Sequence, residues 1–150
     1  MKRSVLWVVL SLVSLGAAAA CSSSSTGSTP PPATSCLAQV GATGALVYPA
    51  QSATGVPDNV GQVIIGTTTT LPSSWNVELF FTSGFLAAIG GSVTPAPNPL
   101  PTPNTIPPFA NPVYQSSGMP VLPAGTTFQV GVNNTASTCL PTIVGVFTTQ

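Results

Sequence analysis

The chain has 150 residues, of which 43% are hydrophobic and only 3% are charged. Lys2 and Arg3 are its only basic side chains, Asp58 and Glu78 are its only acidic ones, and it has no histidine. A serine nucleophile needs a neighbouring base, and acid/base hydrolysis needs two differently tuned carboxyls. Zinc sites need histidine or thiolate clusters, and calcium sites need several convergent carboxylates. The composition therefore predicts a protein that is not an enzyme and that holds no metal or cofactor.

The first twenty residues have the pattern of a secretory signal peptide. A cationic start, Lys2-Arg3, precedes an apolar run over 5–15, and small residues fill 16–20. The apolar run is shorter than the roughly 20 residues that span a bilayer as a permanent helix. We predict that residues 1–20 direct export and are removed, which leaves a mature chain without any cationic side chain. Such a chain cannot neutralise phosphates, so it is expected to bind neither nucleic acid nor anionic lipid electrostatically.

The cysteine that follows resembles the acylation site of bacterial lipoproteins. Ala18-Ala19-Ala20-Cys21 is similar to the lipoprotein box, and the serine run 22–25 is similar to many lipoprotein tethers. Cysteine parity favours the same interpretation, because an exported protein seldom leaves a thiol unpaired and the chain has three cysteines. The resemblance implies a lipid on Cys21 and attachment to a membrane of the cell envelope. The alternative is a secreted protein with a free or intermolecular Cys21.

Small and polar residues make up the next segment. Residues 22–35 contain only Ser, Thr, Gly, Pro and Ala, so they cannot bury enough apolar surface to offset the entropy of ordering. We predict that residues 21–35 are a tether, of which the fourteen residues 22–35 span at most about 45–50 Å when fully extended. Prolines 30–32 stiffen its far half toward polyproline II.

The remaining residues, 36–150, are expected to form one domain built of strands, because no long stretch shows a 3.6-residue period. Prolines bracket 45–48 and 113–115 and predict short edge strands, whereas the β-branched runs 62–67 and 143–148 suit central or doubly covered strands. Periodicity leaves 85–89 open as a strand or a helical turn. The predicted strands, in chain order, are 45–48, 62–67, 75–81, 113–115, 127–132 and 143–148, with 85–89 as the ambiguous seventh.

Alternation is clearest in two of these segments. In 75–81, four large apolar residues share one face, while Asn76 and Glu78 point to water. In 127–132, three apolar residues point inward and Gln129 points outward. About seven short strands predict an all-β, antiparallel two-sheet sandwich of the immunoglobulin-like kind. Asp58 is expected in a turn, where its side chain bonds its own backbone.

Two motifs in this part of the chain resemble bacterial Ig-like domains of surface-layer and other secreted proteins. Residues 49–57, PAQSATGVP, look like the opening of such domains. Residues 122–130, LPAGTTFQV, resemble their turn into a late, aromatic-bearing strand. The resemblance covers most of 49–132 and implies that 36–150 is a single Ig-like β-sandwich domain.

A proline-rich stretch and several aromatic residues are the remaining candidates for a binding surface. Eight prolines crowd 95–112, which predicts a crossover loop between strands or, alternatively, a preformed polyproline segment for a partner's aromatic groove. Aromatic rings on one exposed surface would stack on sugars; the alternative is that they are core residues or are covered by a loop. The rings in question are Phe80, Phe85, Phe109 and Tyr114.

Together these features predict a disulfide and a non-catalytic function. Acylation of Cys21 in an oxidising compartment leaves Cys36 and Cys139 to pair with each other. The leading hypothesis is a cell-envelope lipoprotein that displays one structural or interaction module, with an envelope protein or a glycan as partner. The competing hypothesis is a carbohydrate-binding or adhesive module that uses exposed aromatic residues.

Overall fold

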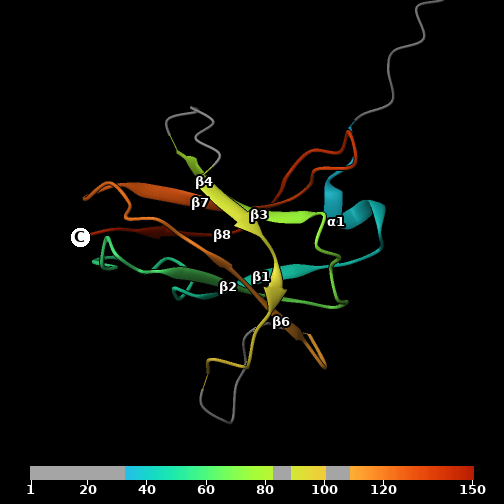
Figure 1. Cartoon of the computed structure of the whole chain (residues 1–150), viewed down its shortest axis with the longest axis horizontal. Coiled ribbons are helices and arrows are strands. Elements are labelled where there is room, and N and C mark those ends of the chain that lie inside the picture. Colours follow the sequence, from blue (N-terminus) through green and yellow to red (C-terminus); the bar gives the residue numbers. More distant parts are fainter. Residues whose placement is uncertain (1–32, 83–88, 101–108) are drawn as a thin grey trace, which may run out of the picture. The chain divides into compact units, whose positions relative to one another are not determined.

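The computed structural model describes residues 33–82, 89–100 and 109–150 (Figure 1). The predicted signal peptide 1–20, Cys21, nearly all of the predicted tether and Phe85 lie outside the described residues. The described chain contains one short helix and eight strands. In chain order they are α1 (Cys36–Gln39), β1 (Gly44–Tyr48), β2 (Gln62–Thr67), β3 (Trp75–Phe81), β4 (Ile89–Ser92), β5 (Thr94–Pro95), β6 (Val113–Gly118), β7 (Thr127–Asn134) and β8 (Thr142–Thr148).

The strands form two antiparallel sheets that face each other (Figure 1). One sheet has the order β1-β2-β6-β5 and the other has the order β4-β3-β7-β8. The predicted all-β, two-sheet antiparallel sandwich is therefore confirmed. The described strand count exceeds the expected seven by one, because β5 contains only two residues and has no detectable pattern of its own.

The inner face of the second sheet follows the alternation seen in the sequence. In β3, Trp75, Val77 and Leu79 are buried, whereas Asn76 and Glu78 on the opposite face are half-buried. In β7 the inward residues are fully buried and Gln129 is exposed. Because successive side chains of a strand point to opposite faces, these patterns alone are sufficient to orient both strands.

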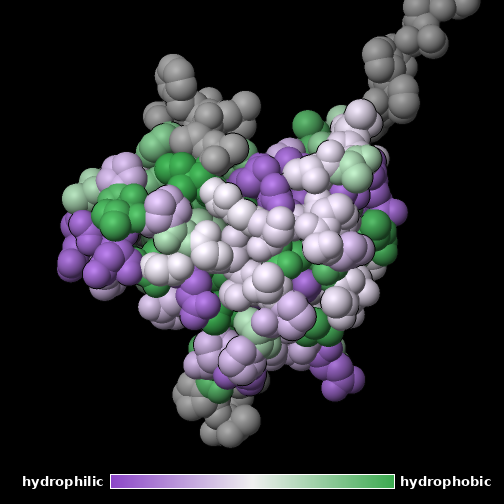
Figure 2. All heavy atoms as spheres, viewed as in Figure 1, coloured by the Kyte–Doolittle hydropathy of each residue, from purple (hydrophilic) through white to green (hydrophobic). Residues whose placement is uncertain are grey.

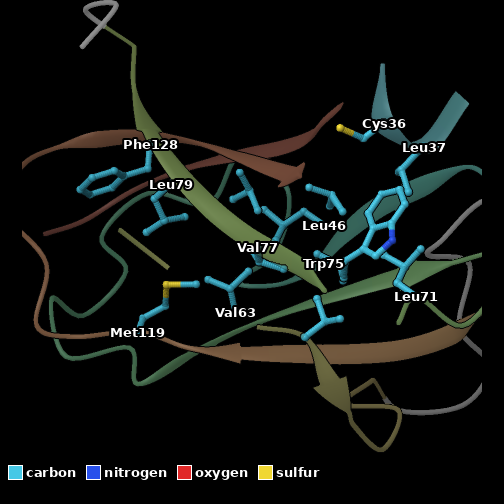
Figure 3. Close-up of a cluster of buried hydrophobic side chains, with 14 of the residues drawn as sticks. Cys36, Leu37, Leu46, Val63, Leu71, Trp75, Val77, Leu79, Met119 and Phe128 are labelled. Carbon is cyan, nitrogen blue, oxygen red and sulfur yellow. The ribbon is translucent and has the colours of Figure 1, made fainter. Parts of the chain in front are cut away.

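The core lies between the two sheets (Figure 3). Phe128 contacts Phe81 and Phe147, with ring centroids 5.3 and 5.8 Å apart. Toward the other end of the core, Figure 3 shows Trp75 with Leu71 and Leu37, and Cys36 nearby. Leu46 of β1 and Val63 of β2 belong to the same core. One continuous core therefore joins α1, both sheets and the loop before β3.

Two predictions about strand position were wrong. Residues 113–115 were expected at an edge, but β6 continues to Gly118 and lies between β2 and β5. The second half of this strand was not predicted, because the small residues 116–118 lack the apolar alternation that indicates a strand in a sequence. Residues 143–148 were expected in a central or doubly covered strand, but β8 is the last strand of its sheet and most of its residues are half-buried or exposed. Residues 51–56 form hydrogen bonds along its outer edge.

The chain passes from one sheet to the other between β4 and β5. Ile89 begins β4, so the ambiguous segment 85–89 ends where this strand starts, and the rest of that segment lies outside the described residues. A Cβ at Gly90 would collide with the carbonyl oxygen of Val77, so the close pairing with β3 requires glycine here. Ser117 Oγ accepts a bond from Gly91 N–H (3.0 Å) and donates one to its carbonyl (2.8 Å). This hydroxyl therefore joins the two sheets at the crossing.

A buried glutamine holds the loop that precedes β3. Gln115 is 1% exposed, and its side chain points into the sandwich from β6. Its Oε1 accepts the N–H of Leu71 and its Nε2 donates to the carbonyl of Leu71, both at 2.9 Å. The side-chain amide of Gln115 thereby pairs with both backbone polar groups of Leu71, whose own side chain is in the core.

We expect Gln115→Leu to destabilise the domain by about 1–3 kcal/mol, because the near-equal volume is kept while two buried backbone groups of Leu71 lose their partners. Ser116→Ala, the neighbouring change on the outer face of β6, is the control and should have less effect. Urea unfolding of the two variants measures the difference. Equal stabilities would show that the pairing with Leu71 contributes nothing.

Candidate functional site

The two cysteines predicted to pair do form a disulfide, with their Cα atoms 4.9 Å apart. The bond joins the first residue of α1 to the segment between β7 and β8. Beside it, Ser35 makes an isolated parallel bridge with Leu140: Cys36 N–H donates to the Leu140 carbonyl (2.8 Å), and Leu140 N–H donates to Thr34 (3.1 Å). Covalent and hydrogen bonds thus fix the point where the chain enters the domain.

The helix next to the disulfide is anchored in the core. Leu37 is 1% exposed, and its N–H donates to Thr142 Oγ1 at the start of β8 (3.0 Å). Sγ of Cys36 lies 3.5 Å from Asn133 Oδ1. Because a disulfide sulfur carries no proton, this is a contact without a hydrogen bond. α1, β7 and the start of β8 therefore meet at the disulfide end of the domain.

The two carboxylates lie in different parts of the fold. Asp58 is half-buried in a turn, and its carbonyl accepts the N–H of Leu122 (2.8 Å). Glu78 lies on the outer face of β3, where Asn133 Nδ2 is 3.2 and 3.3 Å from its two oxygens. Asn133 pairs with Asn76 across the strands and so lies diagonal to Glu78, a position that only the register reveals. Within the described residues, no group of three or more His, Cys, Asp or Glu side chains could hold a metal ion.

Of the four aromatic residues considered as a binding platform, Phe80 and Tyr114 lie in different sheets. Phe80 is on the outer face of β3 and only 8% exposed, and a Cβ added at Gly131 would overlap its ring. Tyr114 is half-buried on the outer face of β6, in the other sheet. Phe109 is half-buried in a loop, and Phe85 lies outside the described residues. Phe80 and Tyr114 therefore cannot share one surface.

Exposed apolar side chains are scattered over the described surface. On the face seen in Figure 2, small apolar areas alternate with polar ones, without one extended apolar patch. Single exposed apolar residues are ordinary for folded proteins. The large ones among the described residues are Val40, Tyr48, Val121, Leu140 and Ile143.

The described residues thus define a disulfide-bonded, antiparallel β-sandwich. No family model, no curated protein and no solved structure matches the chain. In the part of the chain that the structure describes, no helix has the length and apolar character needed to cross a membrane.

Proposed function

We propose that this protein is a non-catalytic lipoprotein of the bacterial cell envelope that displays one Ig-like structural or interaction module, residues 36–150. The observation that carries the proposal is the disulfide, which uses Cys36 and Cys139 and leaves Cys21 as the only other thiol. Cys21 directly follows a sequence with the pattern of a signal peptide. Lipidation at this position accounts for an odd number of cysteines in an exported protein.

Two features support the Ig-like assignment. Residues 49–57, which resemble the opening of bacterial Ig-like domains, directly follow the edge strand β1 and form hydrogen bonds along the edge of β8 in the other sheet. Residues 122–130 include a turn at Gly125, with a φ of +60°, that leads directly into β7. Glycine readily adopts a positive φ, which explains why the motif has glycine at this position.

The chain enters the domain at one end and several loops lie at the other end, which suits display on an anchored tether. The chain enters at Cys36, beside Leu140, where β8 is about to begin. The loops 49–61 and 118–126 and the C-terminal residue Gln150 are bonded to one another at the opposite end of β8. With Cys21 held at a membrane, that far end is the part of the domain presented to partners. In Figure 1 the C-terminus and the chain's entry lie at opposite sides of the sandwich.

The carbohydrate-binding alternative has little support among the described residues, because Phe80 and Tyr114 belong to different sheets. A glycan array probed with the mature protein tests it directly. Binding that is lost in Tyr114→Ala and kept in the exposed control Tyr48→Ala would reinstate that alternative.

Lipidation is the prediction that tests the proposed function. We expect the N-terminal peptide from a membrane fraction to carry a diacyl or triacyl group on Cys21, as measured by mass spectrometry. Cys21→Ser should move the protein from the membrane fraction to the soluble fraction, and Ser23→Ala should leave it at the membrane. An unmodified Cys21 in the soluble medium would contradict the proposal and favour a secreted protein.

A further inference from the structure

The two cysteines of the disulfide differ in their access to solvent. Cys36 is 0% exposed and lies at one end of the core cluster drawn in Figure 3. Cys139 is 9% exposed, and its chain neighbours Thr138 and Leu140 are exposed. Cys36 has no surface that a thiol could reach, so a thiol that attacks the folded domain can reach the disulfide only at Cys139.

The side-chain amide of Asn133 lies between Cys36 and a carboxylate. Its Nδ2 is 3.2 and 3.3 Å from the two oxygens of Glu78, and its Oδ1 is 3.5 Å from Cys36 Sγ. An ionised carboxylate accepts hydrogen bonds and donates none, so the amide turns its nitrogen toward Glu78. The amide oxygen then faces the sulfur. Glu78 thus determines which end of the Asn133 amide the sulfur of Cys36 meets.

This arrangement has opposite effects on the two forms that Cys36 can take once the S–S bond is broken. The protonated thiol can donate a weak S–H hydrogen bond to Asn133 Oδ1. The thiolate instead meets the lone pairs of that oxygen, with the negative charge of Glu78 behind the amide. It also lies where water does not reach it. Like charge and desolvation both disfavour the charged form, so the thiolate of Cys36 is unfavourable here.

We propose that thiols open this disulfide at Cys139 alone, with Cys36 as the leaving group. Glu78 is a positioning residue, which slows the reaction through Asn133. The attacking thiolate forms a bond to Cys139 Sγ while the S–S bond breaks, and its electron pair leaves on Cys36 Sγ. A second thiolate then releases Cys139, so two reagent thiols become one disulfide and the domain gains two electrons. An unstable leaving thiolate lowers the rate of such exchange. This chemistry is independent of lipidation at Cys21.

Trapping of the mixed disulfide identifies the sulfur that is attacked. The probe is β-mercaptoethanol in excess, added to the folded mature chain 21–150 with Cys21→Ser, which has no third thiol. Acid quenching at early times, pepsin digestion and mass spectrometry locate the adduct; trypsin is unsuitable because this chain contains no Lys or Arg. We expect the adduct on Cys139 and the free thiol on Cys36. An adduct on Cys36, or equal adducts on both, would overturn the proposal.

The rate of reduction shows whether the folded domain itself reacts. We expect a rate that is proportional to the concentration of β-mercaptoethanol and that does not change with urea well below the unfolding transition. A rate that rises with urea as the unfolded fraction rises would mean that unfolding exposes the disulfide first. That result, or no reduction in the absence of urea, would overturn the proposal.

Two substitutions that each remove one carboxylate separate positioning from a general effect of charge. Glu78→Gln lets the Asn133 amide turn either end toward the sulfur, so it should raise the urea-insensitive rate several-fold. Asn133→Ala removes the amide oxygen and should act in the same direction. Asp58→Asn is the matched control, because it removes the other carboxylate, in a turn away from the disulfide, and should leave the rate unchanged. Parent-like rates in both Glu78→Gln and Asn133→Ala, or equal acceleration by Asp58→Asn, would contradict the role of Glu78. A loosened fold would raise only the urea-sensitive rate.

Discussion

A protein in which Cys36 and Cys139 are both replaced by serine will melt well below the parent. The disulfide has a sequence separation of 103, and the loop-entropy model gives about 4–5 kcal/mol for a loop of that length. The value is an upper one, because residual structure in the unfolded chain already restricts it. The domain has no basic side chain to form ion pairs with Asp58 or Glu78, so the disulfide is a large part of its stability.

Calorimetry of the parent and of the double variant, both as the mature chain, measures this difference. Cys21→Ser is the matched control, since it removes a thiol outside the disulfide and should leave the melting temperature unchanged. Thiol labelling of the denatured, unreduced parent should modify Cys21 when it is not acylated, and neither of the other two cysteines. An unchanged melting temperature in the double variant would show that the disulfide does not stabilise the fold.

Replacing Phe128 by alanine will destabilise the domain by about 3–5 kcal/mol, the usual cost of truncating a fully buried aromatic side chain. Phe128 is 0% exposed and stacks between Phe81 and Phe147, which belong to β3 and β8. Its ring therefore links three adjacent strands of one sheet to the common core. Removing it leaves a cavity between these strands, which the neighbouring side chains fill only in part.

Tyr48→Ala is the control for this prediction, because Tyr48 is also aromatic and lies on an edge strand but is 41% exposed. Its loss should cost far less stability. Chemical unfolding followed by tryptophan fluorescence suits both variants, since Trp75 is 3% exposed in the native core and becomes solvated on unfolding. Similar losses from the two substitutions would show that Phe128 does not organise the core.

The two ends of the sandwich are built differently. The end that contains the disulfide receives the preceding segment and fixes it by covalent and hydrogen bonds. The opposite end collects the loops 49–61 and 118–126, whose backbones are bonded through Met119 N–H to Gly61 and Leu122 N–H to Asp58. These bonds hold the two loops together at the far end of the domain.

The sequence by itself determined the fold class and most strand positions. The bounds expected for 62–67 and 75–81 are those of β2 and β3, and the inward faces of 75–81 and 127–132 are as expected. Alternation is a local property of a strand with one buried face, so a single sequence contains it. Cysteine parity likewise predicted the disulfide, on the expectation that Cys21 has another role, and the structure contains it.

Only the tertiary structure decided which sheet each strand joins and what its outer edge meets. β4 contains two glycines in four residues and has no apolar pattern, yet it forms because its backbone fits closely against β3. Gln115 and Ser117 point inward because backbone groups from the loop before β3 and from β4 need partners. Phe80 and Tyr114 separate because β3 and β6 belong to different sheets. Such pairings join residues far apart in the chain, and a local pattern of side chains cannot encode them.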